Sequence, residues 1–212
     1  THCISSAASD VYKRQTEDNA NIHEETTGIE IYNDFKKIGL DYWVSGYGTG
    51  GTFTGVSRVL RNKMPKTKLI LTEPDVAPLV ASKNIQKRNS DGSAAESHPS
   101  WNPHPIQGWT TDFIPLVLQE SIDKQYYDEL IPVSGNDGIY WSCELAKKEG
   151  IITGVSGGST FAVAVKVAKK AKPGSNILCM IPDTAERYMS SILFDEIDSE
   201  MDKEERDLLK SV

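Results

Sequence analysis

Gly46-Tyr47-Gly48-Thr49-Gly50-Gly51-Thr52 is the stretch of sequence that decides the fold. It follows an apolar segment typical of a buried strand, residues 41–45, and it precedes a helical pattern over residues 53–64. A turn rich in glycine and threonine between a strand and a helix lets the backbone pass close to a ligand and directs several N–H groups at one point. Because the positive end of the helix dipole lies behind these groups, the turn predicts a binding site for a phosphate group.

Strands and helices alternate outward from this turn. The apolar spacing predicts helices over residues 28–38, 136–149 and 160–171 and buried strands over 68–73 and 176–181. Residues 130–133 predict an edge strand, because Pro132 cannot donate a hydrogen bond to a neighbouring strand. This alternation favours an α/β fold with a parallel sheet and flanking helices.

Two further segments are rich in small or polar residues. Residues 76–111 show little periodicity of either kind, and a loop of this length is typical of a functional or flexible segment. Residues 153–159, TGVSGGS, form a second small-residue turn before the helix expected from Thr160. Because open α/β sheets bind ligands beyond the carboxyl ends of their strands, the two turns together predict a ligand there.

The glycine turn alone leaves several interpretations open. It is not a P-loop, because no Lys-Ser/Thr pair follows its last glycine. A dinucleotide fingerprint fits the glycines, but the acidic residue that it requires would be Glu73, which is followed by a proline and a loop. A tight turn that needs glycine for packing alone is the remaining alternative.

Five segments in order resemble cysteine synthase (O-acetylserine sulfhydrylase), a fold-type II enzyme dependent on pyridoxal phosphate. They are GYGTGGTFTGVSRVL, EPDVAPLVAS, IQGWTTDFIPLVL, KKEGIITGVSGGSTFAVAV and IPDTAERYMSSILF, within a match from about residue 19 to about residue 197. The resemblance implies the large-domain portion of the tryptophan synthase β-like fold and a β-replacement reaction that makes L-cysteine from O-acetyl-L-serine and sulfide. Cystathionine β-synthase shares this scaffold, and GVSGGSTFAVAVK resembles that enzyme equally well.

The resemblance also assigns a cofactor site. The residues that match the loop around the cofactor phosphate are Gly48, Thr49, Gly50, Gly51 and Thr52. Ser156 matches the serine that hydrogen-bonds the pyridine nitrogen, and a hydroxyl there favours elimination of a β leaving group over transamination. The alternative for Ser156 is a cap for a helix that begins at about Gly158. Gly157 departs from the second serine common in many cysteine synthases.

Candidate substrate contacts are fewer. Gly108 and Trp109 match a segment near the substrate cavity, with simple packing as the alternative for Trp109. Asp183 and Thr184 follow the last strand, where the family places residues near the ring, and a helix cap is the alternative. Gln15 aligns with a glutamine that holds the substrate carboxylate, but it is the last residue of the expected non-native leader, so it is not assigned to the site.

Two parts of the family pattern are not found in this sequence. Neither a Schiff-base lysine motif nor the Asn/Thr/Ser substrate loop is found in these 212 residues, so no catalytic residue is assigned. We therefore expect an N-terminally truncated, inactive fragment. Residues 1–15 would be a non-native or disordered leader, residues 16–197 a pyridoxal-phosphate-binding large domain, and residues 198–212 a charged helix or tail. A non-catalytic binding protein on this scaffold is the alternative.

Composition excludes several classes of partner. A net charge of −7 argues against nucleic acid or an anionic membrane, and no apolar run approaches the ~18 residues of a membrane span. Three cysteines without a C-x-x-C spacing, Cys3, Cys143 and Cys179, favour a reducing, cytoplasmic setting with buried thiols. His98 and His104 lack metal-ligand spacing and are expected to be exposed, so no metal site is predicted. The resemblance implies a homodimer.

Overall fold

The computed structural model describes residues 16–188, 191–195 and 200–210, so the expected leader over residues 1–15 lies outside the described residues. The helices are α2 (Glu17–Glu25), α3 (Thr27–Phe35), α4 (Gly51–Lys63), α5 (Leu116–Asp123), α6 (Gly135–Glu149), α7 (Val155–Ala168) and α8 (Lys203–Leu209), with 3-10 turns η1 (Ala185–Tyr188) and η2 (Ile192–Phe194). The strands are β1 (Tyr42–Gly46), β2 (Lys68–Pro74), β3 (Glu129–Val133) and β4 (Ile177–Cys179).

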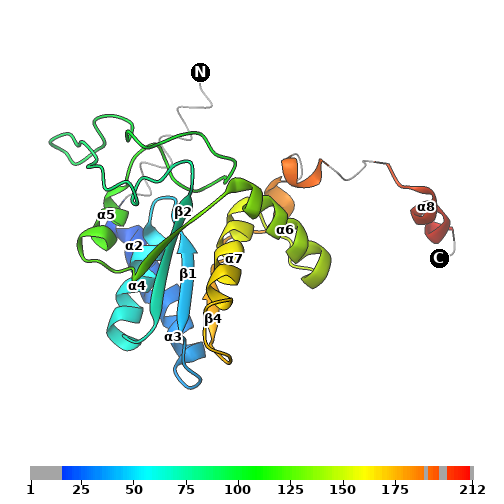
Figure 1. Cartoon of the computed structure of the whole chain (residues 1–212), viewed down its shortest axis with the longest axis horizontal. Helices are drawn as coiled ribbons and strands as arrows, with labels where there is room; N and C mark the ends of the chain where they lie inside the picture. Colours follow the sequence, from blue (N-terminus) through cyan, green and yellow to red (C-terminus); the bar gives the residue numbers. More distant parts are fainter. Residues whose placement is uncertain (1–15, 189–190, 196–199, 211–212) are drawn as a thin grey trace.

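The four strands form one parallel sheet in the order β3-β2-β1-β4 (Figure 1). In the register of this sheet, Tyr42 of β1 lies opposite Lys68 of β2 on one side and Ile177 of β4 on the other. The chain therefore steps from β1 to β2 to β3 in one direction and returns to the far side of β1 with β4. The predicted α/β fold with a parallel sheet is confirmed, and the direction of the crossovers reverses between β1 and β4.

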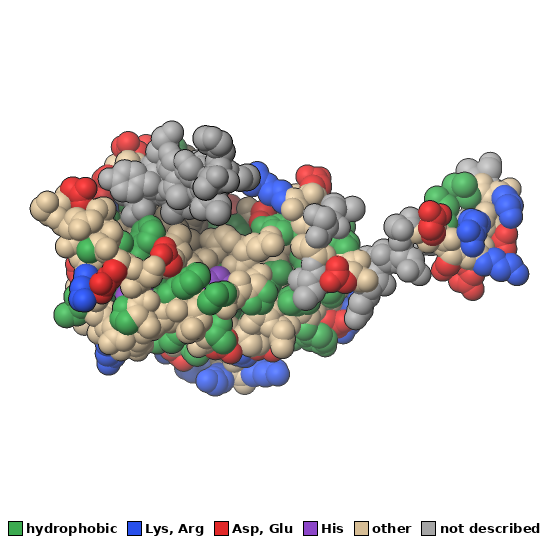
Figure 2. Space-filling model, turned by 90° about the horizontal axis from the view of Figure 1, so that it is seen from above, with side chains coloured by type: hydrophobic (Ala, Val, Ile, Leu, Met, Phe, Trp, Pro, Cys, Tyr) green, Lys and Arg blue, Asp and Glu red, His purple; other side chains and the backbone are tan. Residues whose placement is uncertain are grey.

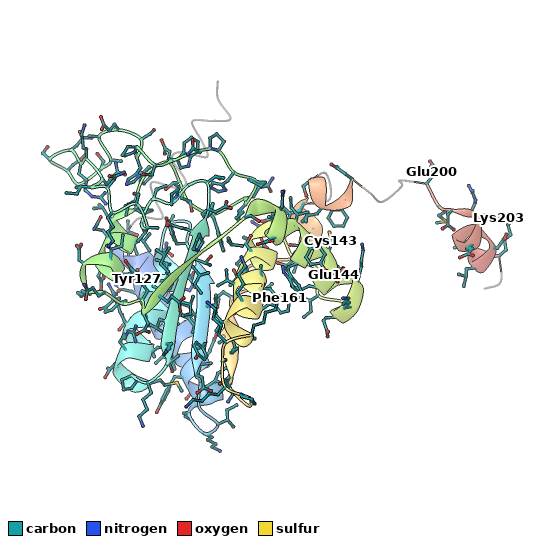
Figure 3. The ribbon with its side chains drawn as sticks, viewed as in Figure 1. Tyr127, Cys143, Glu144, Phe161, Glu200 and Lys203 are labelled. Atoms are coloured by element: carbon teal, nitrogen blue, oxygen red, sulfur yellow. The ribbon has the colours of Figure 1, made fainter. Side chains whose placement is uncertain are left out.

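Helices cover both faces of the sheet. Successive side chains of a strand point to opposite faces, so β1 places Trp43 in one core and Val44 in the other. Trp43 stacks on Phe53 of α4 with ring centroids 5.2 Å apart, and α2, α3 and α5 pack around α4. On the opposite face α7 packs against the sheet and α6 packs against α7 (Figure 3). The rings of Trp141 on α6 and Phe161 on α7 meet edge to face, with centroids 5.4 Å apart.

The expected start of α7 is wrong by five residues. The helix begins at Val155 rather than Thr160, so the small-residue segment lies inside its first turns. Close packing on α6 explains this, because a Cβ added at Gly158 would lie 2.2 Å from the Gly138 carbonyl oxygen. Glycine and serine have low helix propensity, but tertiary packing overrides it here. Ser156 consequently does not cap a helix from Gly158, since the N-cap residue is Gly154.

The remaining predicted elements agree with the structure in part. β3 lies at the edge of the sheet as predicted, and residues 76–111 contain no helix or strand apart from one isolated bridge between Arg88 and Ala94. The sequence did not predict α2 or α5, and β4 is shorter than expected. The expectation that His98 is exposed is wrong: it is 2% exposed and contacts the Asn84 carbonyl oxygen, because the long loop folds over it.

The described C-terminal segment differs from the rest of the molecule. Helix α8 stands apart from the main body and carries acidic and basic side chains together (Figure 2). No helix in the described ranges is both long and apolar enough to cross a membrane. Cys143 and Cys179 are free and partly buried, and burial raises the pKa of the Cys179 thiol to about 11.

Candidate functional site

A cavity of about 580 Å³ lies at the carboxyl ends of β1 and β4, where the crossover direction reverses. This is the position at which open α/β sheets bind ligands, and the volume is that of a small-molecule site. Its lining comprises Ser45, Gly46, Tyr47, Gly48, Thr49, Gly50, Gly51, Thr52, Phe53, Gln107, Gly108, Trp109, Thr111, Ser156, Thr160, Met180, Pro182, Asp183 and Tyr188. The cavity thus brings together the glycine loop, Ser156 and most of the other residues singled out from the sequence.

The glycine loop leaves β1 at Gly46 and enters α4 at Gly51. Gly50 has φ +90°, a left-handed conformation that disfavours any side chain, and an added Cβ would lie 2.6 Å from Leu118 Cβ. A Cβ on Gly48 would lie 2.4 Å from the Gly108 carbonyl oxygen. Glycine is therefore required at both positions for the loop to pass between α5 and residues 107–111.

The start of α4 provides hydrogen-bond donors to the cavity. The first backbone hydrogen bond of α4 runs from the Thr54 N–H to the Gly50 carbonyl, at 2.9 Å. The N–H groups of the three preceding residues, 51–53, therefore have no partner within the helix. No side chain caps this end among the described residues. Together with the helix dipole, these groups favour an anion, although no lysine or arginine of the described chain lines the cavity.

The start of α7 faces the same cavity from the other side. Ser156 is 3% exposed and lines the cavity. Its carbonyl accepts a hydrogen bond from Thr160, at 2.9 Å, whereas no hydrogen bond of its hydroxyl is found within the described part of the chain. The hydroxyl oxygen is not fully enclosed and lies at the cavity wall, so it is available to a ligand.

Asp183 holds the start of α7 in place. Its carboxylate accepts hydrogen bonds from the Gly154 N–H, at 3.3 Å, and from the Tyr188 hydroxyl. Burial, followed by the bond to Asp183, raises the pKa of Tyr188 to about 12. Asp183 therefore lines the cavity and bonds to Gly154, the N-cap residue of α7, but no bond from its carboxylate to the first-turn N–H groups of a helix is found in the described residues. Thr184 is exposed and is not among the lining residues.

Residues 107–109 close a third side of the cavity. Gly108 adopts φ +83°, and its carbonyl oxygen lies against Gly48. The ring of Trp109 occupies the space beside Gly46, where an added Cβ would lie 2.0 Å from the ring, and it also packs against the core on the α7 side. Trp109 thus combines the packing role with a place in the cavity wall.

A buried pair behind the glycine loop was missed from the sequence. The Tyr47 hydroxyl donates to the Glu73 carboxylate at 2.7 Å, and the N–H groups of Val80 and Ala81 donate to the same carboxylate at 3.0 and 2.8 Å. Burial raises the pKa of Glu73, and burial together with the nearby carboxylate raises the pKa of Tyr47 well above its usual range. The only sequence signal was an acidic residue at the end of an apolar strand.

These features define a class: an α/β protein with an anion-binding cavity at the point where its crossovers reverse. A family model described as "Pyridoxal-phosphate dependent enzyme" matches residues 3–183, beginning within the expected leader. The chain therefore belongs to this family, whose solved relatives have the fold-type II architecture. Whether residues 1–15 are a non-native leader remains a prediction.

Individual relatives show which enzymes of this family the chain is similar to. The chain is 38% identical over 184 residues to O-ureido-L-serine synthase of Streptomyces lavendulae, covering 87% of this chain and 51% of that protein. It is 39% identical over 176 residues to cysteine synthase B of Campylobacter jejuni, covering 83% and 51%. A crystal structure of O-ureido-L-serine synthase superimposes with a TM-score of 0.77 and 34% identity, covering 100% of this chain and 61% of that one. The chain thus spans about half the length of the curated relatives it matches.

The cavity fits the cofactor of this family. The phosphate requires several hydrogen-bond donors close together. The loop offers N–H groups without a partner in the helix and two threonine hydroxyls. Its glycines leave room where a Cβ would collide with neighbouring atoms. The ring requires a partner for its nitrogen, and the hydroxyl of the cavity-lining residue Ser156 forms no hydrogen bond within the described residues. No group of three or more potential metal ligands occurs in the described residues.

Proposed function

We propose that this chain forms the cofactor-binding part of an enzyme that makes L-cysteine from O-acetyl-L-serine and sulfide by β-replacement. The observation that supports this most directly is that a single cavity contains both the glycine loop and the Ser156 hydroxyl. In this proposal residues 48–52 hold the phosphate and Ser156 contacts the ring nitrogen. Gly108, Trp109 and Asp183 border the substrate, and Thr184, being exposed, is the weakest of the proposed contacts.

Bound pyridoxal phosphate supplies an electron sink for the substrate's α-carbon, so that a β substituent can leave and be replaced. The chain's own residues set the conditions for this chemistry. The N–H groups at the start of α4 hold the phosphate dianion without a positively charged side chain. The Ser156 hydroxyl donates to the ring nitrogen and, being neutral, does not protonate it, which favours β-elimination over transamination.

The proposal places the Schiff-base lysine outside these residues. No lysine lines the cavity within the described part of the chain, and the chain covers about half of its curated relatives. We therefore propose that the 212 residues bind the cofactor but do not turn over substrate by themselves. The homodimer implied by the resemblance and the cytoplasmic location favoured by the cysteine content both remain predictions.

Two other β-replacement products are second candidates. The chain is 38% identical to the relative from Streptomyces lavendulae and 39% identical to cysteine synthase B, so O-ureido-L-serine is also a candidate product. The segment GVSGGSTFAVAVK equally favours cystathionine. If the protein instead only binds a ligand without catalysis, we expect it to bind the cofactor or a ligand and to form none of these products.

The test uses the protein expressed with its full coding sequence. O-acetyl-L-serine is supplied with sulfide, hydroxyurea or homocysteine, and the amounts of cysteine, O-ureido-L-serine and cystathionine are compared. Cysteine formation outpacing the other two supports the proposal, and either other product in excess overturns the choice of nucleophile. We expect Ser156→Ala to lower kcat/KM about tenfold, through the lost hydrogen bond, and to weaken cofactor retention less.

Ser159→Ala is the matched control. Ser159 lies in the same helix, is equally buried and bonds to the Val155 carbonyl at 2.8 Å, but it is not a lining residue. Unchanged turnover in Ser156→Ala, or an equal loss in both variants, would count against the ring contact.

A further inference from the structure

Helix α2, which the sequence did not predict, touches the glycine loop through two side chains. The Asn19 amide donates to Thr49 Oγ1 at 2.9 Å. The Nε2 atom of His23 lies 3.1 Å from Thr52 Oγ1, and its Nδ1 atom lies 3.0 Å from Thr27 Oγ1. Both threonine side chains of the loop are thus in contact with α2, from the side opposite α7 and Ser156.

The direction of these bonds determines what the loop can bind. A threonine hydroxyl has one hydrogen to donate. Thr49 accepts from Asn19, so its own hydrogen is left for another acceptor. Burial lowers the pKa of His23, which favours the neutral ring with one hydrogen. If that hydrogen is on Nε2, the His23 Nε2–H donates to Thr52 Oγ1, and the Thr27 hydroxyl donates to Nδ1. The hydroxyl hydrogen of Thr52 is then free to donate to another acceptor.

Two free hydroxyl hydrogens at a helix start call for a partner that only accepts hydrogen bonds, such as a phosphate. Building on the proposed function, we propose that Asn19 and His23 are positioning residues that orient the hydroxyls of Thr49 and Thr52 toward the cofactor phosphate. The opposite tautomer of His23 would take up the hydrogen of Thr52 and leave an oxygen lone pair facing the anion. The proposal therefore specifies the Nε2–H tautomer in the loaded site.

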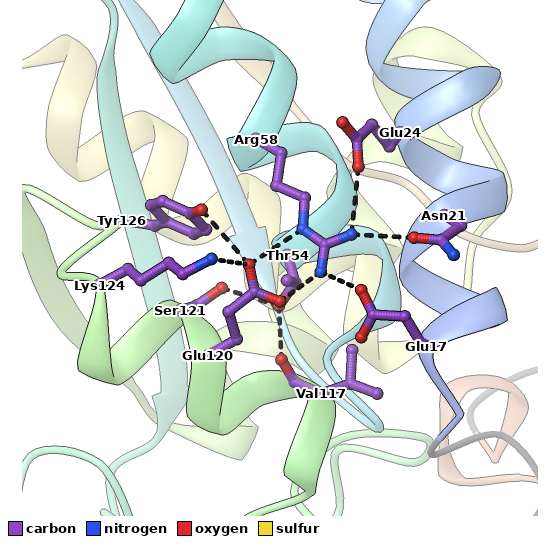
Figure 4. A network of polar contacts seen from close by, with 10 residues as sticks. All are labelled: Glu17, Asn21, Glu24, Thr54, Arg58, Val117, Glu120, Ser121, Lys124 and Tyr126. Carbon is purple, nitrogen blue, oxygen red and sulfur yellow. Dashed lines mark hydrogen bonds and ion pairs between the residues drawn. The ribbon is translucent and has the colours of Figure 1, made fainter.

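The packing of α2 supports a positioning role. Two glycines one turn apart allow α2 to approach α4 closely: an added Cβ at Gly51 would lie 2.4 Å from the Asn19 side chain, and one at Gly55 would lie 2.2 Å from the Ala20 carbonyl oxygen. Arg58, one turn further along α4, pairs with Glu17 at 2.5 Å and Glu24 at 3.1 Å of α2 (Figure 4). The backbone of α2 is thereby fixed at the distance that these hydrogen bonds need.

The Arg58 network reaches a third helix. Arg58 forms a two-pronged ion pair with Glu120 of α5, which in turn contacts Lys124 at 3.0 Å. It also donates to the Asn21 side chain of α2 at 3.0 Å. The ion pairs of Arg58 therefore join α2, α4 and α5 around the loop, and a shift of α2 would break its pairs with Arg58.

The experiment compares the affinity of the apo form of the full-length protein for pyridoxal phosphate and for pyridoxal, which lacks the phosphate. We expect Asn19→Ala and His23→Ala each to weaken pyridoxal phosphate binding about tenfold, the cost of a poorly made hydrogen bond to a charged group, and to leave pyridoxal binding unchanged. His23→Gln should restore affinity, because its amide can donate from a position near Nε2, whereas His23→Asn should not. Asn62→Ala, at an exposed residue of α4, is the matched control.

A double-mutant cycle tests the connection to the loop hydroxyl. On a Thr52→Val background, His23→Ala should cause little additional loss, because the hydroxyl that it orients is already absent. If His23→Ala does not fold, as judged by circular dichroism, the comparison of His23→Gln with His23→Asn decides instead.

The outcomes separate this proposal from the proposed function. Wild-type preference for pyridoxal phosphate with unchanged affinity in both α2 variants overturns the positioning role and leaves the proposed function standing. Equal losses for pyridoxal and pyridoxal phosphate also overturn it, since they indicate a general structural role. A wild-type protein that binds both ligands equally, or neither, overturns the phosphate site and the positioning role together.

Discussion

Glu73 is fully buried at the carboxyl end of β2, and three donors converge on its carboxylate. One of these donors is Tyr47 of the glycine loop, and the other two are backbone N–H groups at the start of the long loop. The carboxylate thus connects the loop that forms the cavity to the segment that covers it. Burial of the charge opposes this arrangement, and it outweighs the three hydrogen bonds in setting the pKa, which is raised.

The raised pKa predicts how stability changes with pH. The folded state holds the Glu73 proton more tightly than the unfolded chain, so this contribution is present in full below the usual pKa of 4.5 and is lost as pH rises through the folded value. As pH rises from about 4 to about 7, the unfolding free energy of wild type should therefore fall relative to that of Glu73→Gln. Urea unfolding at several pH values measures this difference. Glu30→Gln, at an exposed residue of α3, should show no such trend, and a constant difference for Glu73→Gln would contradict the assignment.

Helices α2, α4 and α5 form one unit around Arg58. The guanidinium side chain is 15% exposed, and its partners come from α2 and α5, which lie far apart in the sequence. Hydrogen bonding to Arg58 lowers the pKa of Glu120. The stability that this pair provides is therefore present above the unfolded pKa of Glu120 and is lost as pH falls through the folded value.

Removal of Arg58 should loosen this unit. We expect Arg58→Ala to cost about 2 kcal/mol near pH 7, between the values typical of exposed and of buried ion pairs, and less in acid, where Glu120 is protonated. Urea unfolding followed by circular dichroism gives the free energy, and limited proteolysis shows whether α2 becomes accessible. Lys66→Ala removes an exposed positive charge that follows α4 and should change neither result. A loss independent of pH would show that Arg58 acts through packing instead.

The whole molecule places the starts of two helices around one cavity. β1 and β4 are neighbours in the sheet, and α4 and α7 lie on its opposite faces, so their first turns meet beyond the strand ends. The two helix dipoles add at this position, so the proposed phosphate site is compatible with an acidic chain of net charge −7.

Ligand binding should consequently stabilise the molecule unevenly. At 100 times its Kd, pyridoxal phosphate should add about 2.7 kcal/mol to the free energy of unfolding. Hydrogen exchange should show protection at the first turns of α4 and α7, while α8, which lies apart from the cavity, serves as an internal control. Protection spread evenly over α6 and α8 would argue against the cavity as the binding site.

The sequence alone determined the features that depend on local periodicity and turn chemistry. The glycine turn between β1 and α4, the edge position of β3 and the α/β class follow from short-range patterns, and the structure confirms them. The cofactor family was recognisable from a resemblance carried by five segments in order, because the glycine turn by itself left several ligands open. Sequence periodicity failed at α7, where packing against α6 places residues of low helix propensity inside a helix.

Only the tertiary structure decided which of these residues act together. Ser156 meets the glycine loop because the sheet order places β4 beside β1, which no local pattern specifies. The hydrogen bonds of Asn19 and His23, the burial of Glu73 and the burial of His98 likewise depend on contacts between distant segments. Burial and hydrogen-bond direction are properties of the packed chain, so the sequence determined the parts of the site and the fold determined their partners.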